Sequence, residues 1–230
     1  VVLGSKQTFG KGTVQNVLEL NRFVSKSTYG DLGALKYTTD KFYRITGKST
    51  QLEGVKSDVV APDRYAYVDI GEKDEDNPLV WDQIASASFS KWNGYENYQS
   101  VIQNSSERIA NNELFQLIDD NAKWVKSQQD KNIFSLNYEL YSSEIKKDET
   151  VADTFEVLDD YSNSLSFSSL PYERIKMKTD TILAEKRKRW KKALNKDMYL
   201  EEAVHILEDL ELNFIPVSYT HLTLPTTKNV

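Results

Sequence analysis

The sequence contains no cysteine, which excludes a disulfide scaffold, a thiolate metal site and a cysteine nucleophile. It also lacks a run of roughly 18 apolar residues, the minimum for a membrane-spanning helix. Basic residues number 29 against 35 acidic ones, so the net charge is −6. This balance argues against nucleic acid as the main partner, because phosphate binding needs a basic face. What remains is a globular chain of 230 residues, long enough for one large domain or two small ones.

Histidine is scarce as well, since His205 and His221 are the two that the sequence contains. His221 falls in the string VSYTHLTLPT at residues 217–226, which resembles the conceptual translation of a transposon-based sequencing adaptor. We therefore expect residues 217–230 to be an adaptor artefact and exclude them from the fold and the function. Because His205 then stands alone, a histidine-based catalytic triad or a multi-histidine metal site is excluded.

The chain opens on Val1-Val2-Leu3-Gly4 and not on methionine. This run is typical of the end of a buried strand that enters a glycine turn. Because a strand needs neighbours, we expect its pairing partners to lie upstream of Val1. No signal peptide is visible, and in a chain that begins in this way its absence carries no information about the compartment.

The distribution of glycine divides the chain, because seven of the nine glycines fall at or before Gly54. This first part is rich in threonine, valine, tyrosine and phenylalanine. Its alternating runs predict strands at residues 35–45 and 55–60, with a turn at residues 47–49 between them. The charged segment at residues 71–78 is loop-like and indicates a domain boundary.

Beyond that boundary the apolar residues follow a helical spacing. The predicted helices are at about residues 106–128, 151–158 and 173–194, with a last one that Asp197 caps and that runs to Leu212. The layout is therefore of the α+β class, with a β-rich part followed by a mostly helical one.

Two segments of the helical part carry more specific expectations. Alternating apolar residues at 134–140 favour a strand or an extended arm. The basic run at residues 185–192 indicates a solvated helix face, with Trp190 and Ala193 packed inward. Docking of this run on an acidic partner or on another domain of the same protein is the second interpretation.

The stretch TFGKGTVQ, residues 8–15, places Lys11 between two glycines. A phosphate-binding loop needs a glycine, four residues and then Gly-Lys-Ser/Thr. Here Gly4 stands one position too far from Gly10, and Lys11 is followed by glycine, so that interpretation fails. Two others stay open. Lys11 is either a general base kept neutral by burial in an apolar site, or an ordinary lysine in a glycine-rich turn.

Together with residues 35–58, this stretch resembles the C-terminal processing peptidases, the tail-specific proteases of the serine–lysine type in peptidase family S41. In that family the lysine of the turn is the general base that deprotonates a serine, and a glutamine four residues later orients it. The resemblance therefore implies that Lys11 is the base and that Gln15 orients it. If residues 11–15 are extended, positions i and i+4 face the same side, so the amide can hydrogen-bond the amine.

The resemblance covers most of residues 1–212. The segments that carry it are residues 51–58, with Ser57 where the family has proline, and residues 131–138 and 197–207, which are similar to the helical C-terminal domain of the periplasmic enzymes. It implies that residues 1–70 are the C-terminal part of a peptidase domain and that residues 71–215 are the helical C-terminal domain.

The family's nucleophilic serine lies well before the lysine, and only ten residues precede Lys11 here. Ser5 is too close along the chain to replace it. We therefore expect the nucleophile and the peptide-binding PDZ domain to lie upstream of this sequence. The chain would then hold the base without the attacking oxygen and would be inactive alone.

The resemblance implies a serine-type endopeptidase that cleaves proteins near unstructured, apolar C-terminal tails, in the periplasm or another extracytoplasmic compartment. The implied partners are such substrates, the upstream PDZ and peptidase segments and an adaptor protein, with no nucleic acid. No metal, nucleotide or other cofactor is implied. The alternative is a non-catalytic module, in which residues 77–212 form a helical scaffold that docks an adaptor or the PDZ domain.

Overall fold

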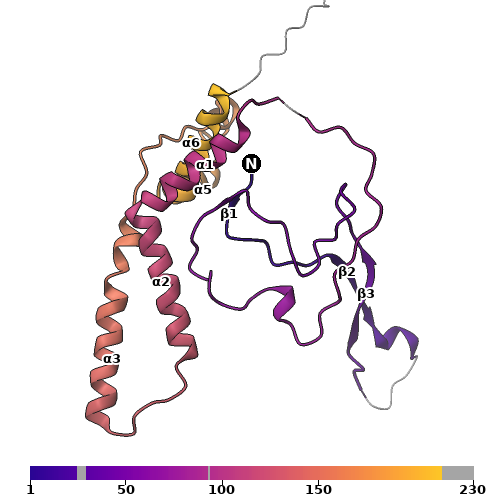
Figure 1. Cartoon of the computed structure of the whole chain (residues 1–230), viewed down its shortest axis with the longest axis horizontal. Helices are drawn as coiled ribbons and strands as arrows, with labels where there is room; N and C mark the ends of the chain where they lie inside the picture. The colour runs from indigo at the N-terminus through magenta and orange to yellow at the C-terminus, as the bar shows by residue number, and fades with distance from the viewer. Residues whose placement is uncertain (25–29, 93, 214–230) are drawn as a thin grey trace, which may run out of the picture.

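The computed structural model describes residues 1–24, 30–92 and 94–213. The adaptor-like residues 217–230 lie outside the described residues. Figure 1 shows an N-terminal part with little regular structure beside a group of helices, which confirms the α+β class. In the part of the chain that the structure describes, no helix is both long and apolar enough to cross a membrane.

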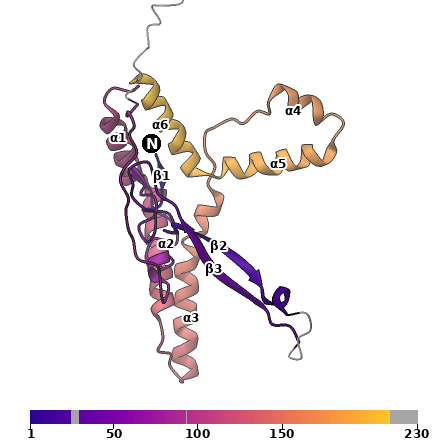
Figure 2. The same ribbon diagram turned by 90° about the vertical axis from the view of Figure 1, so that its right-hand side faces the viewer.

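In its described residues, the N-terminal part contains two small sheets of two strands each. Strand β1 (Leu3–Gly4) pairs in parallel with β4 (Val59–Val60), so that Leu3 lies opposite Val59. Strand β2 (Thr13–Glu19) pairs antiparallel with β3 (Ala34–Lys41) and forms a long ribbon that projects from the molecule (Figure 2). A 3-10 helix, η1 (Leu20–Phe23), follows β2.

The predicted strands of this part are longer than the observed ones. The strand expected at residues 35–45 ends at Lys41, because the chain turns back and the Gly47 N–H donates to the Arg44 carbonyl at 2.8 Å. The strand expected at residues 55–60 is reduced to β4, since a short partner leaves only two residues to pair.

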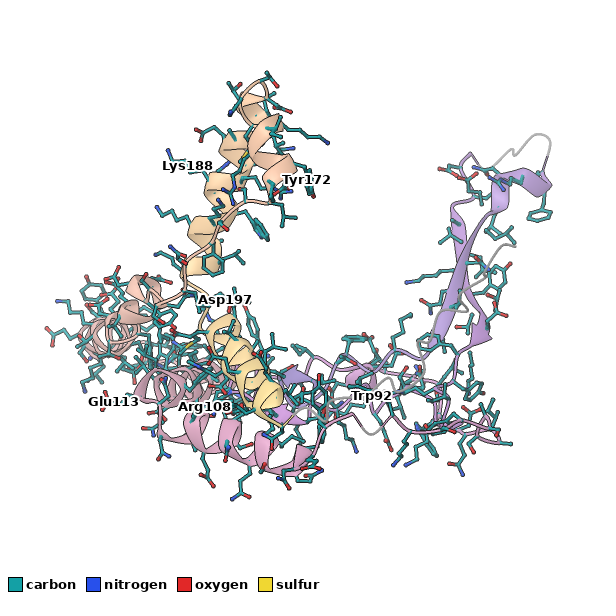
Figure 3. The ribbon with its side chains drawn as sticks, turned by 90° about the horizontal axis from the view of Figure 1, so that it is seen from above. Trp92, Arg108, Glu113, Tyr172, Lys188 and Asp197 are labelled. Carbon is teal, nitrogen blue, oxygen red and sulfur yellow. The ribbon has the colours of Figure 1, made fainter. Side chains whose placement is uncertain are left out.

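The helical part consists of six α-helices and two short 3-10 helices in the described residues. Their bounds are η2 (Glu72–Asp74), α1 (Tyr98–Asn111), α2 (Glu113–Asp130), α3 (Tyr138–Asp153), η3 (Glu156–Asp160), α4 (Pro171–Lys176), α5 (Thr181–Asn195) and α6 (Met198–Leu212). Helices α2 and α3 form a long hairpin (Figure 1), and α4 and α5 form an arm that points away from it (Figures 2 and 3).

Asn112 divides the helix that was expected at residues 106–128. Its side chain accepts hydrogen bonds from the N–H groups of Leu114 and Phe115, at 2.9 and 3.3 Å, and so caps the start of α2. An asparagine in this role ends one helix and begins the next. The prediction of a single helix is therefore wrong, although the expected apolar face is retained in α2.

An asparagine also starts a helix within residues 134–140, where a strand or extended arm was expected. Residues 131–137 have no regular structure, and α3 begins at Tyr138 because Asn137 accepts from the N–H groups of Glu139 and Leu140. The prediction of a strand is wrong. Helix α3 also takes up the start of the helix expected at residues 151–158, and η3 takes up its end.

The basic helix expected at residues 173–194 consists of two helices, since Asp180 accepts from the Leu183 N–H at 2.9 Å and starts α5. Trp190 is 52% exposed and the Arg187 guanidinium lies 5.2 Å from its ring centre, so the inward packing expected of Trp190 and Ala193 is wrong. The helix expected to follow Asp197 is confirmed, because that side chain accepts from the Leu200 N–H at 3.0 Å.

The core lies where α1 and α6 cross the small parallel sheet. Its buried members are Val59, Ala61, Val101, Ile109, Phe115, Met198, Ile206 and Leu210. In addition, the Tyr199 hydroxyl donates to the Pro62 carbonyl at 2.6 Å. The helices therefore share their core with the end of the N-terminal part, and this packing fixes the two parts against each other.

Candidate active site

The turn that carries Lys11 lies against a second turn at residues 49–55. Backbone hydrogen bonds join the two, from the Leu52 N–H to the Gly10 carbonyl at 2.7 Å and from the Thr8 N–H to the Val55 carbonyl at 3.0 Å. The Thr50 hydroxyl donates to the Lys11 carbonyl at 3.1 Å. The second turn therefore binds the backbone of Lys11 itself and the backbone of the residues that precede it.

The two glycines beside Lys11 are required by this close approach. Gly10 has φ +95°, a conformation that residues with a side chain rarely adopt. At Gly12 a Cβ atom would lie 2.5 Å from the backbone nitrogen of Gln51, which is far inside contact distance. Both turns can pack together only because these positions carry no side chain.

The structure brings the two site residues of the sequence analysis together. The Lys11 amine (Nζ) donates to the side-chain oxygen (Oε1) of Gln15 at 2.8 Å. Lys11 precedes β2 and Gln15 is its third residue, so the extended backbone turns both side chains to the same side. Lys11 itself is exposed, and the burial expected for a neutral base is not present in the described residues.

A β-bulge lies directly opposite Gln15. Val14 pairs with Asp40 whereas Gln15 pairs with Thr38, so Thr39 has no partner in the register. Its hydroxyl instead accepts from the Asn16 side chain at 3.0 Å. Bulges redirect neighbouring side chains and are common beside active sites. This one lies in β3, directly across from the position in β2 that carries Gln15.

Sequence reasoning did not assign a role to Gln51 or Glu72, both of which belong to the site. Gln51 is fully buried and accepts the Gly12 N–H on its side-chain oxygen at 2.8 Å. Its side-chain nitrogen donates to Glu72 at 2.9 Å. These two contacts join residues that are 39 and 21 positions apart, so no local pattern in the sequence indicates them. The one sequence signal for Gln51 was its place in a segment that resembles the family.

Within residues 1–24, 30–92 and 94–213, no serine hydroxyl is hydrogen-bonded to the Lys11 amine. Ser5 is exposed, and its hydroxyl donates to the Gln7 carbonyl at 3.4 Å. The described residues therefore supply a positioned amine and an amide that orients it.

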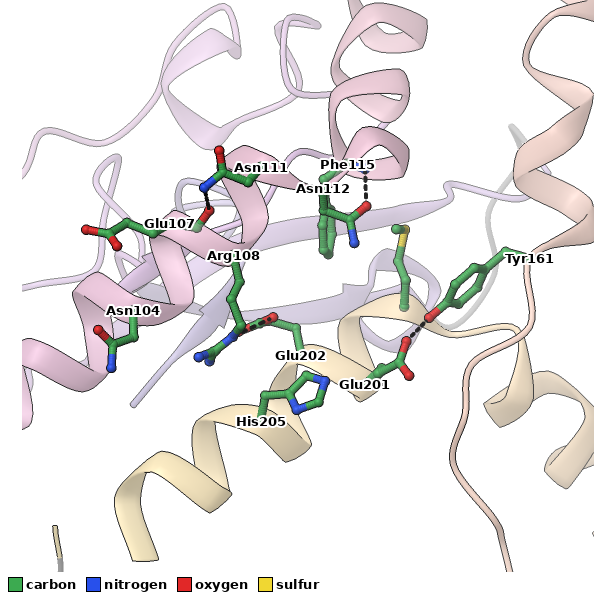
Figure 4. A pocket seen from close by; sticks show the side chains of 11 residues that line it. Asn104, Glu107, Arg108, Asn111, Asn112, Phe115, Tyr161, Glu201, Glu202 and His205 are labelled. Atoms are coloured by element: carbon green, nitrogen blue, oxygen red, sulfur yellow. Dashed lines mark hydrogen bonds and ion pairs between the residues drawn. The ribbon is translucent and has the colours of Figure 1, made fainter. Parts of the chain in front are cut away.

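A pocket of about 610 Å³ opens between α1 and α6 and is lined mainly by polar side chains (Figure 4). On one wall Arg108 pairs with Glu202, and on another Tyr161 donates to Glu201. Burial opposes ionisation of Glu201, but the hydrogen bonds from Tyr161 and Ser164 outweigh it and lower the pKa of Glu201. Burial and the neighbouring Glu201 raise the pKa of Tyr161.

The polar groups of this pocket are thus largely satisfied by one another. In the described part of the chain, no group of three or more histidine, aspartate or glutamate side chains is arranged to hold a metal ion. The pocket offers no pairing of a base with a nucleophile. The turn around Lys11 is therefore the candidate site for chemistry.

Comparisons with known proteins match both parts of the chain. The family described as the C-terminal domain of tail specific protease matches residues 65–211, and peptidase family S41 matches residues 1–61. The tail-specific protease of Haemophilus influenzae is 37% identical over 153 residues, which are 65% of this chain and 22% of that protein. The chain thus spans about a fifth of the length of this curated relative.

Proposed function

The chain belongs to the tail-specific protease family, and from this premise we propose that it carries the general base of a serine-type endopeptidase. Lys11 is the base and Gln15 orients it. The observation that carries the proposal is the 2.8 Å hydrogen bond between these two side chains, on a turn whose backbone is fixed by residues 50–52.

In the proposed mechanism the neutral Lys11 amine takes the proton of a serine hydroxyl as the serine oxygen attacks the scissile carbonyl. The C–N bond then breaks, and the lysine passes the proton to the leaving amine. Water hydrolyses the resulting acyl-enzyme with the same amine as base. Gln15 accepts one N–H of the lysine, so it directs the amine's lone pair without bringing a charge next to it.

The serine is contributed by a part of the complete protein that precedes these residues. The exposure of Lys11 supports this assignment, because the amine is open to a group that approaches from outside the described residues. When that segment covers the amine, water is excluded, and loss of solvation favours the neutral form that a base needs.

The proposed substrates are proteins with unstructured, apolar C-terminal tails, recognised with the help of a PDZ domain and an adaptor protein elsewhere in the assembly. The proposed compartment is the periplasm or another extracytoplasmic space. No metal or nucleotide enters the proposed reaction.

The substrate preference is tested with two substrates that share one folded domain and differ only in the last residues of an unstructured tail. The complete protein should remove the apolar tail at least about 10-fold faster than a tail ending in aspartate and glutamate, because the lost apolar contacts are worth more than about 1.4 kcal/mol. Intact-mass measurement of both reactions over time gives the two rates. Equal rates would contradict the preference for apolar tails, and absence of cleavage of either substrate would contradict the protease activity.

The alternative is a non-catalytic helical scaffold, and one observation favours it. The connection between α2 and α3 exposes apolar side chains at the tip of the hairpin, among them Ile133, which is 83% exposed, and Leu136, which is fully exposed. A docking module would present such a surface. A complete protein that binds apolar tails without cleaving them would support this alternative.

A further inference from the structure

The side-chain amide of Gln51 is completely buried and uses both of its ends. Its oxygen accepts the N–H of Gly12, one residue after Lys11, and its nitrogen donates to the carboxylate of Glu72. A buried polar group is tolerated when it is fully hydrogen-bonded and is costly when it is not. Removal of this amide would therefore leave the Gly12 N–H unpaired inside the protein.

Glu72 also contacts the lysine turn directly, through its backbone. Its N–H donates to the carbonyl of Phe9 at 2.8 Å, two residues before Lys11. The short helix η2 that carries it is fixed in turn, because the Asp74 carboxylate accepts the Gly71 N–H at 2.8 Å. Residues 71–74 therefore hold the turn directly at Phe9 and, through the Gln51 side chain, at Gly12.

These contacts cross the boundary between the two family matches. Phe9, Gly12 and Gln51 lie in the range matched by peptidase family S41, whereas Glu72 lies in the range matched by the C-terminal domain. A turn of the form Gly-Lys-Gly has no neighbouring side chains of its own to restrict it, and glycine gives the chain more conformational freedom than any other residue. Its shape depends on the groups that bind its backbone from outside.

We propose that Gln51 and Glu72 are positioning residues, through which the first segment of the C-terminal domain holds the Lys11 amine in place for proton transfer. This inference rests on the proposed function of Lys11. It gives the C-terminal domain a part in the chemical step, because a displacement of about 1 Å in a catalytic group can cost on the order of 100-fold in rate. Gln51 is fully buried, so its side chain acts through the turn.

The hydrogen-bond pattern makes the test specific. In Glu72→Gln the new amide oxygen can still accept from Gln51, so kcat should stay within about 3-fold of the original value. In Glu72→Ala the acceptor is lost, and kcat should fall by about 10- to 100-fold at unchanged KM. In Gln51→Glu two carboxylates would face each other, so kcat should fall similarly.

The double variant Gln51→Glu with Glu72→Gln restores a complementary pair, since the carboxylate accepts from both Gly12 and the new amide. It should recover most of the lost kcat, which a general loss of packing would not allow.

Glu75→Ala is the matched control, because Glu75 is an exposed carboxylate at the end of the same short helix. The assay is cleavage of the apolar-tail substrate by the complete protein, with circular dichroism to check folding.

The outcomes separate this inference from the function on which it rests. If the original protein is inactive, or if Lys11→Ala is active, the proposed function itself fails. If those two behave as expected but Glu72→Ala cleaves at the original rate, the positioning role is overturned. It is also overturned if the double variant stays as slow as Gln51→Glu alone.

Discussion

Replacement of Lys11 by alanine in the complete protein is expected to lower kcat/KM by about 1,000-fold, since a positioned general base contributes roughly 10²- to 10⁴-fold. The backbone of this turn is held by hydrogen bonds that do not involve the amine. The fold should therefore be unchanged, and the measured loss should belong to the chemical step. Initial rates on the apolar-tail substrate provide the measurement.

Two further variants make the Lys11 result interpretable. Lys11→Arg places a guanidinium at this position that cannot give up its proton in a protein, so it should be as inactive as the alanine variant if the amine acts as a base. Lys6→Ala removes an exposed lysine from the same segment and should keep full activity. Cleavage by Lys11→Ala at more than about a tenth of the original rate would exclude the proposed role.

Replacement of Arg108 by alanine is expected to lower the free energy of unfolding by about 3 kcal/mol or more. Arg108 joins α1 to α6 through ion pairs of 2.8 Å to Glu202 and to Asp209. The Glu202 side chain is only 6% exposed and also accepts from the buried hydroxyl of Ser105 at 2.6 Å. Removal of the arginine leaves a buried carboxylate without its cation, which is more costly than loss of the pair as a whole.

Urea denaturation of the 230-residue chain, followed by helical circular dichroism, measures this effect. Glu202→Gln in the Arg108→Ala background should recover part of the loss, because it removes the unpaired charge. Lys123→Ala is the control, since that ion pair to Asp119 lies on an exposed helix face and should hardly matter. An Arg108→Ala variant as stable as the control would show that α1 and α6 do not depend on this cluster.

The local features of the fold could be read from the sequence. Asp197 was predicted to begin the last helix and does so, because capping needs only a side chain and the N–H groups next to it. The proximity of Lys11 and Gln15 was implied by the family resemblance, and an extended backbone over four residues allows it. In both cases the contact joins residues close together in the sequence, so no distant partner is needed to form it.

The errors arose where two local signals competed or where a distant partner decided. Asn112 and Asn137 begin helices in regions where the apolar spacing predicted a continuous helix or a strand. Trp190 was expected to pack inward, but α5 has no buried residue in the described structure, so the ring stays at the surface. The bond between Gln51 and Glu72 was missed because no sequence period connects them.

The most direct test of the account is to label the complete protein with a fluorophosphonate that reacts with activated serines and to locate the label by peptide mass spectrometry. We expect a single labelled serine that precedes residue 1 of this sequence. Labelling should be lost in Lys11→Ala and retained in Lys6→Ala, because only the Lys11 amine would activate the hydroxyl. A serine that is labelled equally well without the Lys11 amine would contradict the assignment of Lys11 as the general base.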